Sequence, residues 1–464
     1  MRADEYLQFD ASTLARLIAT RDISPVEVIE ACLSRLDVVG PSLNAFDSVD
    51  ADGARRAAVE AERQLLSGAQ CGPLHGVPIS IKDLIDVRGL PARYGSLTLK
   101  DNVAVADAPS VDRVRHAGAI VIGKTATSEF GARGYTSSRL HGNTKNPWSL
   151  ARTPGGSSGG AAASVAAGVT PFALGTDGGG SIRAPAAFTG LFGIKATFGR
   201  VPVWPASATP TLAHVGPLAR TLGDAELLLE VISGEDPRDQ FSYLPSLHRD
   251  LDQIEPSNLR VAFAPTMGYG KVDAPVASVV RKAVSNLGIV FPNIEQIETV
   301  CDEAADIFIT EFMAGCAARL GALAHSPDEL DPVLRAGIER FRARPAQDIA
   351  DALRYRYRIK EQIAALFQKY DVLITPTAPC VAWKAEEGVP PGHEHATAWS
   401  YFTYPFNLTG QPAGTLPCGL TADGMPVGLQ IVAPLCREDR LLTVMKASET
   451  VISAGFGASI DPRP

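Results

Sequence analysis

The sequence predicts an α/β protein, because short apolar stretches that suit buried strands alternate with helical patterns over residues 70–230. The clearest helix is the alanine-rich run Ala161–Ala167, which ends at Gly168, a usual residue at a helix C-terminus. The apolar stretch Phe172–Leu174 follows and is bounded by proline and glycine, as expected of a short buried strand. The 464 residues contain no low-complexity linker and no internal repeat, so we expect one domain over 1–464.

The other predicted elements continue this alternation. Ser24-Pro25-Val26-Glu27 is a capping box with proline at the first helical position, and it predicts the start of an amphipathic helix. Farther along, the patterns predict a helix through Leu227, Leu228 and Val231, a strand at Leu259–Phe263, mainly helix over 300–370, a buried strand at Tyr370–Thr377 and a loop at Val389–His395 with solvated histidines. The 300–370 segment lacks catalytic motifs, and we expect it to shape the substrate cleft.

Two serines stand in separate glycine clusters, Ser157 within Gly155–Gly160 and Ser181 within Gly175–Arg183. Only the predicted helix and strand lie between the clusters. If the strand runs antiparallel to the helix, a climb of about 12–15 Å along the helix is undone by a return of about 20 Å along the strand. Both serines then lie at the same edge of the sheet, which suggests an active site.

Three glycines, Gly178, Gly179 and Gly180, come directly before Ser181. Many glycine turns exist only because the backbone needs a positive φ or a close approach. Successive glycines before a serine also expose backbone N–H groups with no side chains in the way, which a developing oxyanion requires. A helix that begins near Ile182 would add the positive end of its dipole. The cluster therefore predicts an oxyanion loop, with a plain turn as the alternative.

A serine hydroxyl is a weak nucleophile until a base takes its proton. None of the eight histidines lies in a motif that marks a triad member. Lys82 lies near the end of Gly76–Asp83, a predicted strand in a largely uncharged context. Burial lowers the pKa of an ammonium group, so Lys82 is a candidate neutral base. The alternative is a lysine that reaches solvent at the strand end or pairs with Asp83.

Four segments together resemble the amidase signature family of serine hydrolases: Gly76–Asp83, Gly118–Phe130, Gly142–Arg200 and Tyr404–Val432. The resemblance spans most of the chain. It implies a single large mixed β-sheet flanked by helices on both faces, with a catalytic signature core at 70–230. It also implies hydrolysis of a small carboxylic acid amide, to the acid and ammonia or an amine, through an acyl-enzyme and without a cofactor or a metal.

The family's Ser–cis-Ser–Lys triad has a matching position for each member. The resemblance implies that Ser181 is the nucleophile, that Ser157 is the bridging serine after a cis Gly156–Ser157 bond, and that Lys82 is the base. Gly178, Gly179 and Gly180, with the Ser181 N–H, match the oxyanion loop. Polar positions around the triad, which would orient it or contact substrate, are matched by Ser158, Thr176, Asp177 and Arg183. An Asp177–Arg183 ion pair would fix the loop.

The alternative function is that of the glutamine-hydrolysing component of a tRNA-dependent amidotransferase, its A subunit. Glutaminases of the family carry an aspartate two residues before a Phe-Thr pair, where this chain has Ser400. We also find no family arginine segment around Leu334–Gly337. Both differences favour a stand-alone amidase. An aromatic group in the same C-terminal motif is open to two readings, an acyl pocket or plain core: Tyr401, Phe402, Tyr404 and Phe406.

Two other motif matches are weaker. Gly118–Thr125 fits the phosphate-loop pattern. Helix-like residues precede its first glycine and strand-like residues lie between its glycines, so nucleotide binding is disfavoured. Gly155–Gly159 fits the nucleophile elbow of α/β-hydrolases. An apolar strand should precede that elbow, whereas Asn146–Pro154 is typical of a loop.

Composition is that of an ordinary globular enzyme, with 45% hydrophobic and 20% charged residues. A net charge of −8 gives no basic footprint for nucleic acid. Seven widely spaced cysteines without a Cys-x-x-Cys pair favour free thiols in a reducing compartment. No signal peptide and no apolar run of about 18 residues is found. We therefore expect a cytoplasmic enzyme with a small-molecule partner and no membrane association, and a homodimer stays open.

Overall fold

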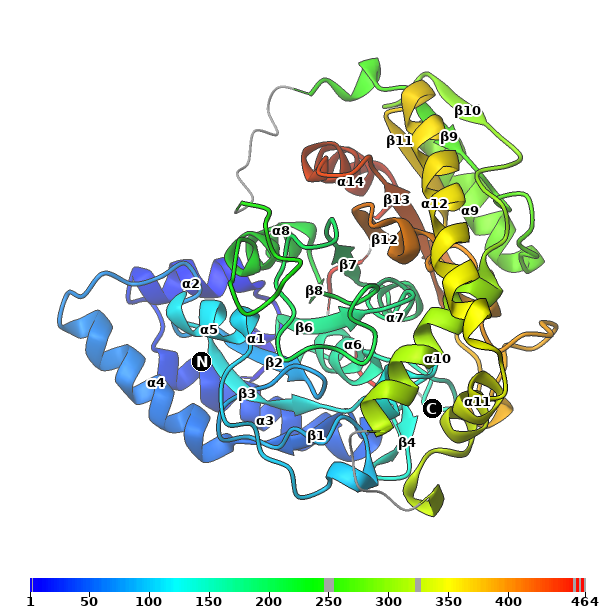
Figure 1. Cartoon of the computed structure of the whole chain (residues 1–464). Coiled ribbons are helices and arrows are strands. Elements are labelled where there is room, and N and C mark those ends of the chain that lie inside the picture. The colour runs from blue at the N-terminus through cyan, green and yellow to red at the C-terminus, as the bar shows by residue number, and fades with distance from the viewer. Residues whose placement is uncertain (2, 246–253, 322–326, 454–455, 459, 463–464) are drawn as a thin grey trace.

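One mixed sheet of 11 strands runs through the protein (Figure 1). The computed structural model describes residues 1, 3–245, 254–321, 327–453, 456–458 and 460–462, and all statements below concern those residues. Across the sheet the strands are β1 (Phe46–Val49), β3 (Ile120–Thr125), β2 (Pro78–Lys82), β6 (Phe172–Asp177), β8 (His214–Ala219), β7 (Phe192–Lys195), β12 (Ala413–Leu420), β13 (Pro426–Val432), β11 (Val372–Pro376), β9 (Val261–Phe263) and β10 (Ile294–Gln296). A separate small hairpin pairs β4 (Ser137–Ser138) with β5 (Gly142–Asn143).

The sheet has a parallel group of strands on either side of an antiparallel middle, and its edge strand β1 pairs antiparallel with β3. Strand β2 runs parallel to both β3 and β6, and β9 runs parallel to both β10 and β11. Between them, β6, β8, β7, β12, β13 and β11 pair antiparallel in succession. The carboxyl ends of parallel neighbours meet at one edge of a sheet. The residues that end β2 and β6, Lys82 and Asp177, therefore lie at the same edge.

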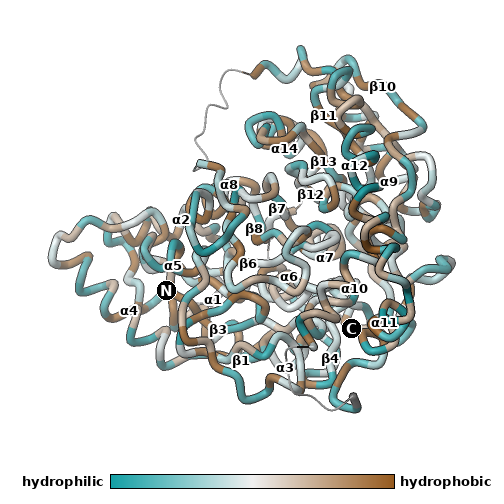
Figure 2. Tube along the Cα trace, in the orientation of Figure 1, coloured by the Kyte–Doolittle hydropathy of each residue, from teal (hydrophilic) through white to brown (hydrophobic). Residues whose placement is uncertain are grey.

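Helices connect and cover these strands. In chain order they are α1 (Ala3–Tyr6), α2 (Ala11–Ala19), α3 (Pro25–Leu43), α4 (Ala51–Leu66), α5 (Pro109–His116), α6 (Gly159–Ala166), α7 (Arg183–Thr189), α8 (Leu222–Ile232), α9 (Ala274–Leu287), α10 (Ala305–Gly321), α11 (Pro332–Arg342), α12 (Ala346–Lys369), α13 (Pro405–Thr409) and α14 (Glu438–Ile452). Figure 2 shows polar residues concentrated on outer helices such as α4 and α12, whereas the central strands are more hydrophobic.

The helices lie on both faces of the sheet. A Cβ at Gly414 of β12 would lie 2.3 Å from the sulfur of Met445, so Gly414 faces α14. The next residue, Thr415, points to the opposite face and pairs in register with Gln430 of β13. The Gln430 side chain accepts a hydrogen bond from Arg183 of α7 (2.8 Å). Helix α7 therefore covers the face opposite α14, and the predicted architecture is confirmed.

Local signals explain several element ends. The Ser24 hydroxyl accepts from the Val26 N–H (3.0 Å) and the Glu27 carboxylate accepts from the Ser24 N–H (2.9 Å), so the predicted capping box starts α3. Gly168 follows the end of α6 with φ +76°, a left-handed conformation that favours glycine. The 300–370 segment is mainly helical, as predicted, and contains α10, α11 and α12.

Two details differ from the sequence predictions. The strand expected at Leu259–Phe263 starts only at Val261, because a 3-10 turn holds Pro256–Asn258 just before it. In the loop Val389–His395, the predicted solvation is wrong for His393. Its Nε2 lies 3.2 Å from Asp273 Oδ1, and the imidazole is buried against that carboxylate.

Candidate active site

Lys82 ends β2 and is fully buried. Its Nζ lies 2.8 Å from the hydroxyl oxygens of Ser157, Ser158 and Thr176. The alternative in which Lys82 reaches solvent or pairs with Asp83 is wrong, because the Asp83 carboxylate pairs instead with Lys124 (3.1 Å). Burial lowers the pKa of the Lys82 ammonium well below its usual range, although the Asp177 carboxylate opposes that shift. Lys82 therefore lies among hydroxyl groups, in surroundings that favour its neutral form.

Ser157 precedes α6, and its peptide bond to Gly156 is cis, as the resemblance implied. The Thr136 hydroxyl donates to the Gly155 carbonyl (2.9 Å) and accepts from the Gly159 N–H (2.9 Å), so it holds both sides of this turn. Ser157 is almost completely buried and also lines a cavity. Its hydroxyl thus lies between the Lys82 amine and a cavity.

Ser181 reaches the same place from the other glycine cluster. The Ser158 N–H donates to the Ser181 carbonyl (3.3 Å), which joins the two clusters directly. Ser181 and Ser157 line one cavity, and Ser181 is 6% exposed. The prediction that both serines lie at one edge of the sheet is confirmed.

An ion pair holds the loop before Ser181. Arg183 contacts both carboxylate oxygens of Asp177, with Nε 3.0 Å from Oδ2 and a terminal nitrogen 2.9 Å from Oδ1, and both side chains are fully buried. The Asp177 carboxylate also accepts the N–H groups of Gly180 (2.7 Å) and Ile182 (3.2 Å). Burial alone would raise the pKa of Asp177, but the Arg183 guanidinium lowers it well below its usual value. The predicted Asp177–Arg183 pair is present.

The three loop glycines have different surroundings. Gly180 has φ +132°, and a Cβ there would lie 2.2 Å from the Thr403 hydroxyl, which itself donates to the Gly179 carbonyl (2.6 Å). A Cβ at Gly179 would collide with the Phe308 ring at 2.4 Å. At Gly178 the nearest atom to a Cβ would be 3.4 Å away, an ordinary contact. Packing therefore requires glycine at 179 and 180 but not at 178.

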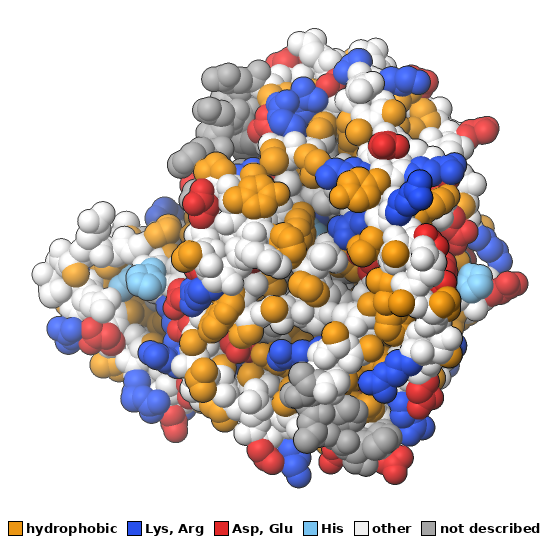
Figure 3. Space-filling view, viewed as in Figure 1, with side chains coloured by type: hydrophobic (Ala, Val, Ile, Leu, Met, Phe, Trp, Pro, Cys, Tyr) orange, Lys and Arg blue, Asp and Glu red, His pale blue; other side chains and the backbone are white. Residues whose placement is uncertain are grey.

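The cavity in front of the two serines has mainly apolar walls. Figure 3 shows this hollowed face of the molecule, with hydrophobic side chains around the hollow. Five aromatic rings line the cavity, those of Tyr94, Phe130, Trp204, Phe312 and His214. Arg319 is the one permanently charged side chain among its described lining residues, and its guanidinium lies 5.6 Å from the Tyr94 ring centroid.

The aromatic residues of the C-terminal motif belong to the core rather than to this cavity. Tyr401, Phe402, Tyr404 and Phe406 are all buried in a hydrophobic cluster with α12 and β11, and none is among the cavity's described lining residues. The acyl-pocket reading of that group is therefore wrong. The rings that line the cavity come from scattered loops and helices. A clue in the sequence was the Pro- and Trp-rich stretch 202–205.

The two competing motifs are resolved by their secondary structure. In Gly118–Thr125, Lys124 lies inside β3 and its ammonium pairs with Asp83, so the segment forms no phosphate-binding loop. Ahead of Gly155–Gly159, the chain from 146 to 154 contains turns and an isolated bridge between Asn146 and Ser149. No strand leads into Ser157 within this described stretch, which excludes a nucleophile elbow.

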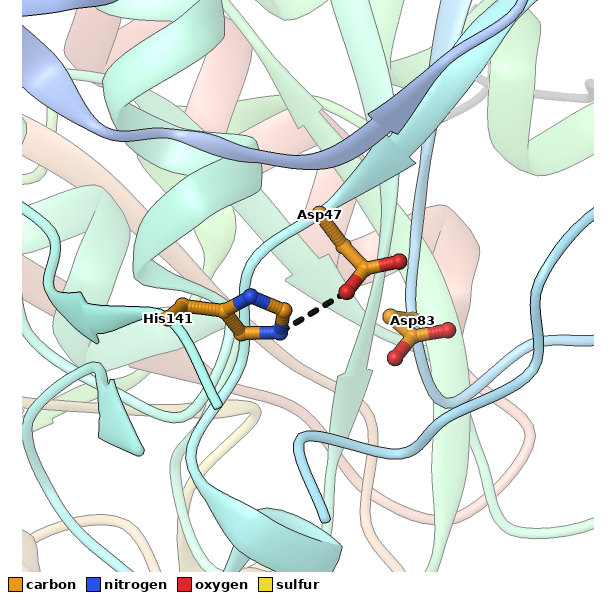
Figure 4. Close-up of side chains that lie close together, drawn as sticks. All are labelled: Asp47, Asp83 and His141. Atoms are coloured by element: carbon orange, nitrogen blue, oxygen red, sulfur yellow. Dashed lines mark ion pairs between the residues drawn. The ribbon is translucent and has the colours of Figure 1, made fainter. Parts of the chain in front are cut away.

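One group of potential metal ligands lies together among the described residues: Asp47, Asp83 and His141 (Figure 4). His141 Nε2 lies 2.8 Å from Asp47 Oδ1. Each carboxylate also faces a cation, since Arg93 lies 3.2 Å from Asp47 and Lys124 lies 3.1 Å from Asp83. A divalent cation would have to displace these positive groups. The donor set therefore fits a buried charge network better than a metal site.

Comparisons with known proteins identify the family of the chain. The sequence pattern of the Amidase family matches residues 27–442. An acylamidase of Rhodococcus erythropolis is 36% identical over 453 residues, which cover 95% of each protein. The A subunit of a glutamyl-tRNA(Gln) amidotransferase from Acidothermus cellulolyticus is 35% identical over 95% of this chain and 93% of its own length. The solved structure of a bacterial aryl acylamidase superposes with a TM-score of 0.89 and 27% identity over 96% of each chain.

These findings define an enzyme that hydrolyses amide C–N bonds. The chain belongs to the amidase family. Within the described residues no helix has both the length and the apolar character that crossing a membrane requires.

Proposed function

We propose that the protein converts a small carboxylic acid amide to the acid and ammonia or an amine, through an acyl-enzyme on Ser181. The observation that carries this proposal is the 2.8 Å contact between Lys82 Nζ and Ser157 Oγ in a buried site whose cavity is lined by both serines. A neutral amine next to a hydroxyl can act as a base, and a serine on the cavity wall can reach a substrate carbonyl.

The reaction follows from these positions. Neutral Lys82 accepts the Ser157 proton while Ser157 accepts the proton of Ser181, whose oxygen attacks the amide carbonyl carbon. The C–N bond breaks as the relay returns a proton to the leaving nitrogen. Water then attacks the acyl-enzyme by the same relay, which releases the acid and restores Ser181.

Backbone N–H groups of the glycine loop stabilise the tetrahedral oxyanion in this scheme. The Gly180 N–H already donates to Asp177 Oδ1, so we assign the oxyanion to the N–H groups of Gly178, Gly179 and Ser181. In this assignment Gly180 does not bind the oxyanion, and its backbone conformation, with φ +132°, shapes the loop. Loss of one oxyanion donor typically lowers kcat by about 10²–10³-fold. Ser158 and Thr176 hold the Lys82 amine, and Asp177 and Arg183 hold the loop.

The cavity favours an apolar or aryl substituent on the amide. Its aromatic rings and the wall that contains Pro202 and Pro205 offer dispersion contacts. Helix α10 supplies Phe312 and Arg319 to the lining, which supports a role for the 300–370 segment in shaping the cleft.

Glutamine is the second candidate substrate, and Arg319 is the observation that favours it. A guanidinium at the cavity wall can bind a carboxylate, and the relatives include amidotransferase A subunits. Against this reading, Ser400 occupies the aspartate position of family glutaminases, is fully buried, and donates its hydroxyl to Thr397 rather than to a ligand.

The test is the release of ammonia or amine from aliphatic, aryl and amino-acid amides, including glutamine. The parent is run beside Ser181→Ala, with Ser67→Ala, an exposed serine at the end of α4, as the matched control. We expect turnover of simple amides in the parent and the control, and none in Ser181→Ala. Turnover that survives Ser181→Ala would overturn the nucleophile assignment, and turnover of glutamine alone would select the second candidate.

Cytoplasmic location and the choice between monomer and homodimer remain predictions from the sequence. Light scattering on the purified chain decides the second, since a homodimer would have twice the mass of 49.0 kDa.

A further inference from the structure

A second buried lysine lies close to the oxyanion loop and has no part in the proposed proton relay. Lys195 ends β7 and is fully buried. Its Nζ contacts the Gln411 carbonyl (2.5 Å), the Ala196 carbonyl (3.4 Å) and the Nε2 atom of His214 (3.4 Å). Carbonyl oxygens only accept hydrogen bonds. Burial and the Arg183 charge lower the pKa of the Lys195 ammonium well below its usual range, although Asp177 and Glu438 oppose that shift. The ammonium and the neutral amine both carry an N–H for the Nε2 atom, which makes Lys195 a donor toward His214.

The partners of His214 fix its tautomer. Its Nδ1 lies 2.8 Å from the Leu212 carbonyl and 3.2 Å from the Asp177 carbonyl. Both oxygens can only accept, so Nδ1 carries the proton and Nε2 accepts from Lys195. The charged groups that face His214 are Lys195, Asp177 and Arg183, and burial together with the Lys195 charge lowers the pKa of the imidazole. His214 is therefore a neutral ring with a fixed Nδ1–H.

This donor acts on the first peptide of the oxyanion loop. The Asp177 carbonyl belongs to the same peptide group as the Gly178 N–H. Asn407 Nδ2 donates to the same Asp177 carbonyl (3.0 Å) and to the Leu212 carbonyl (3.2 Å). Two buried donors thus tie the loop to the segment that carries Leu212, just before β8. A hydrogen bond to a peptide carbonyl polarises the peptide and strengthens its N–H as a donor.

We propose that His214 is a positioning residue for the oxyanion loop. Its Nδ1–H orients and polarises the Asp177–Gly178 peptide so that the Gly178 N–H points at the reacting oxygen, and Lys195 holds the imidazole in place through its contact with Nε2. The inference rests on the proposed function, because it assigns the oxyanion to this loop.

A matched pair of variants tests the donor. In His214→Asn the amide nitrogen takes the place of Nδ1, whereas His214→Leu has similar bulk and no donor. Both variants lack the Nε2 atom and so remove the same acceptor from Lys195. A difference in kcat between them therefore reports the donor at Nδ1. We expect His214→Leu to lower kcat by about tenfold, less than the 10²–10³-fold for loss of an oxyanion donor itself, with KM nearly unchanged. His214→Asn should recover most of that loss. Equal losses in the two variants, or a loss confined to KM, would overturn the proposal.

The contact with Lys195 has a separate signature in a double-mutant cycle. In Lys195→Met the Leu212 and Asp177 carbonyls still require the proton on Nδ1, so the tautomer is kept and only the hold on the ring through Nε2 is lost. Lys195→Met should therefore lower kcat by about tenfold at most, below the effect of losing an oxyanion donor. In the His214→Leu background, which has no imidazole to hold, the same substitution should cause little further loss of kcat. Equal fold-losses of kcat in the two backgrounds would contradict a role of Lys195 through His214.

The proposed function and the positioning role of His214 fail in different ways. If Ser181→Ala keeps its activity, the proposed function is wrong. If Ser181→Ala is inactive but His214→Asn and His214→Leu are equally impaired, only the positioning role is wrong. Should Lys195→Met not fold, the His214 pair still decides that role.

Discussion

Lys82 and Lys195 end two strands of the same sheet, both are fully buried, and their partners differ in kind. Lys82 has three hydroxyl groups at 2.8 Å, which can either donate or accept, and one carbonyl oxygen, that of Thr176, farther away at 3.5 Å. Its amine can therefore gain and lose a proton while its nearest partners stay hydrogen-bonded. Lys195 faces two carbonyl oxygens and an imidazole nitrogen, which need a donor. Burial alone therefore does not make a lysine a base, because its hydrogen-bond partners determine whether the amine can take up and release a proton.

A third buried lysine completes the comparison. Lys124 pairs with the carboxylate of Asp83, which follows Lys82 directly in the chain. Burial raises the pKa of Asp83, and the Lys124 ammonium opposes that shift. The Lys124 ammonium thus compensates a buried negative charge beside the active strand, a role in stability rather than in proton transfer.

The largest predicted difference between the lysines is in turnover. Lys82→Met should lower kcat by about 10²–10⁴-fold, the usual contribution of a general base. Lys195→Met keeps the relay and should lose only about tenfold, below the effect of losing an oxyanion donor. Steady-state kinetics on a simple amide checks both variants. Equal losses of kcat in the two variants would contradict the assignment of Lys82, and not Lys195, as the base.

The second prediction concerns the pH dependence of kcat/KM in the parent. Only neutral Lys82 accepts a proton, so kcat/KM should fall about tenfold per pH unit below its pKa. Because burial lowers that pKa, the limb should lie well below the ordinary lysine value of about 10.4. The measurement is kcat/KM from acid to alkaline pH with a neutral amide. If kcat/KM instead falls below a pH near the ordinary lysine pKa, the pKa of Lys82 is not lowered.

Two glycines of the proposed oxyanion loop offer a matched pair of substitutions. Gly180→Ala should lower kcat by about 10²–10³-fold, because a Cβ at φ +132° meets the Thr403 hydroxyl and displaces the loop. Gly178→Ala keeps its N–H and its Cβ meets only an ordinary contact, so it should lose much less activity than Gly180→Ala. Amide turnover and thermal unfolding are measured together. Equal turnover in the two variants would show that the loop is not so constrained.

The smallest effect on chemistry is expected at the third lysine. Lys124→Met leaves the Asp83 carboxylate buried without its ammonium, and it should lower the free energy of unfolding by about 3–5 kcal/mol. Adding Asp83→Asn removes the unpaired charge and should restore part of that loss. Denaturant titration of the single and double variants checks this. A double variant less stable than Lys124→Met would contradict the charge-compensation role.

The sequence predicted the parts of the site that short motifs encode. Lys82, Ser157 and Ser181 come from local patterns whose strands and turns follow from glycine, proline and apolar spacing, and the structure brings these residues together. The cavity wall was not predicted, because Trp204 and Phe312 approach it only through contacts between distant segments. For the same reason the C-terminal aromatic residues were open to two readings.

His214 was also missed, because its role depends on a tautomer set by two backbone carbonyls and on a lysine contact from the neighbouring strand. A signal was present in the sequence. Lys195 and His214 are the polar ends of two short apolar stretches, Phe192–Lys195 and His214–Ala219, and a polar side chain next to a buried stretch needs a partner.

The most direct test of the central claim is the acylation step itself. A single turnover of an activated aryl amide is quenched in acid at increasing times, and the mass of the protein and of its Ser181 peptide is measured in the parent, Lys82→Met and Lys195→Met. We predict an acyl group on Ser181 that forms quickly in the parent, somewhat more slowly in Lys195→Met and barely at all in Lys82→Met. An acyl group on another residue, or equal rates in the two lysine variants, would contradict the assignment of Ser181 as nucleophile and Lys82 as base.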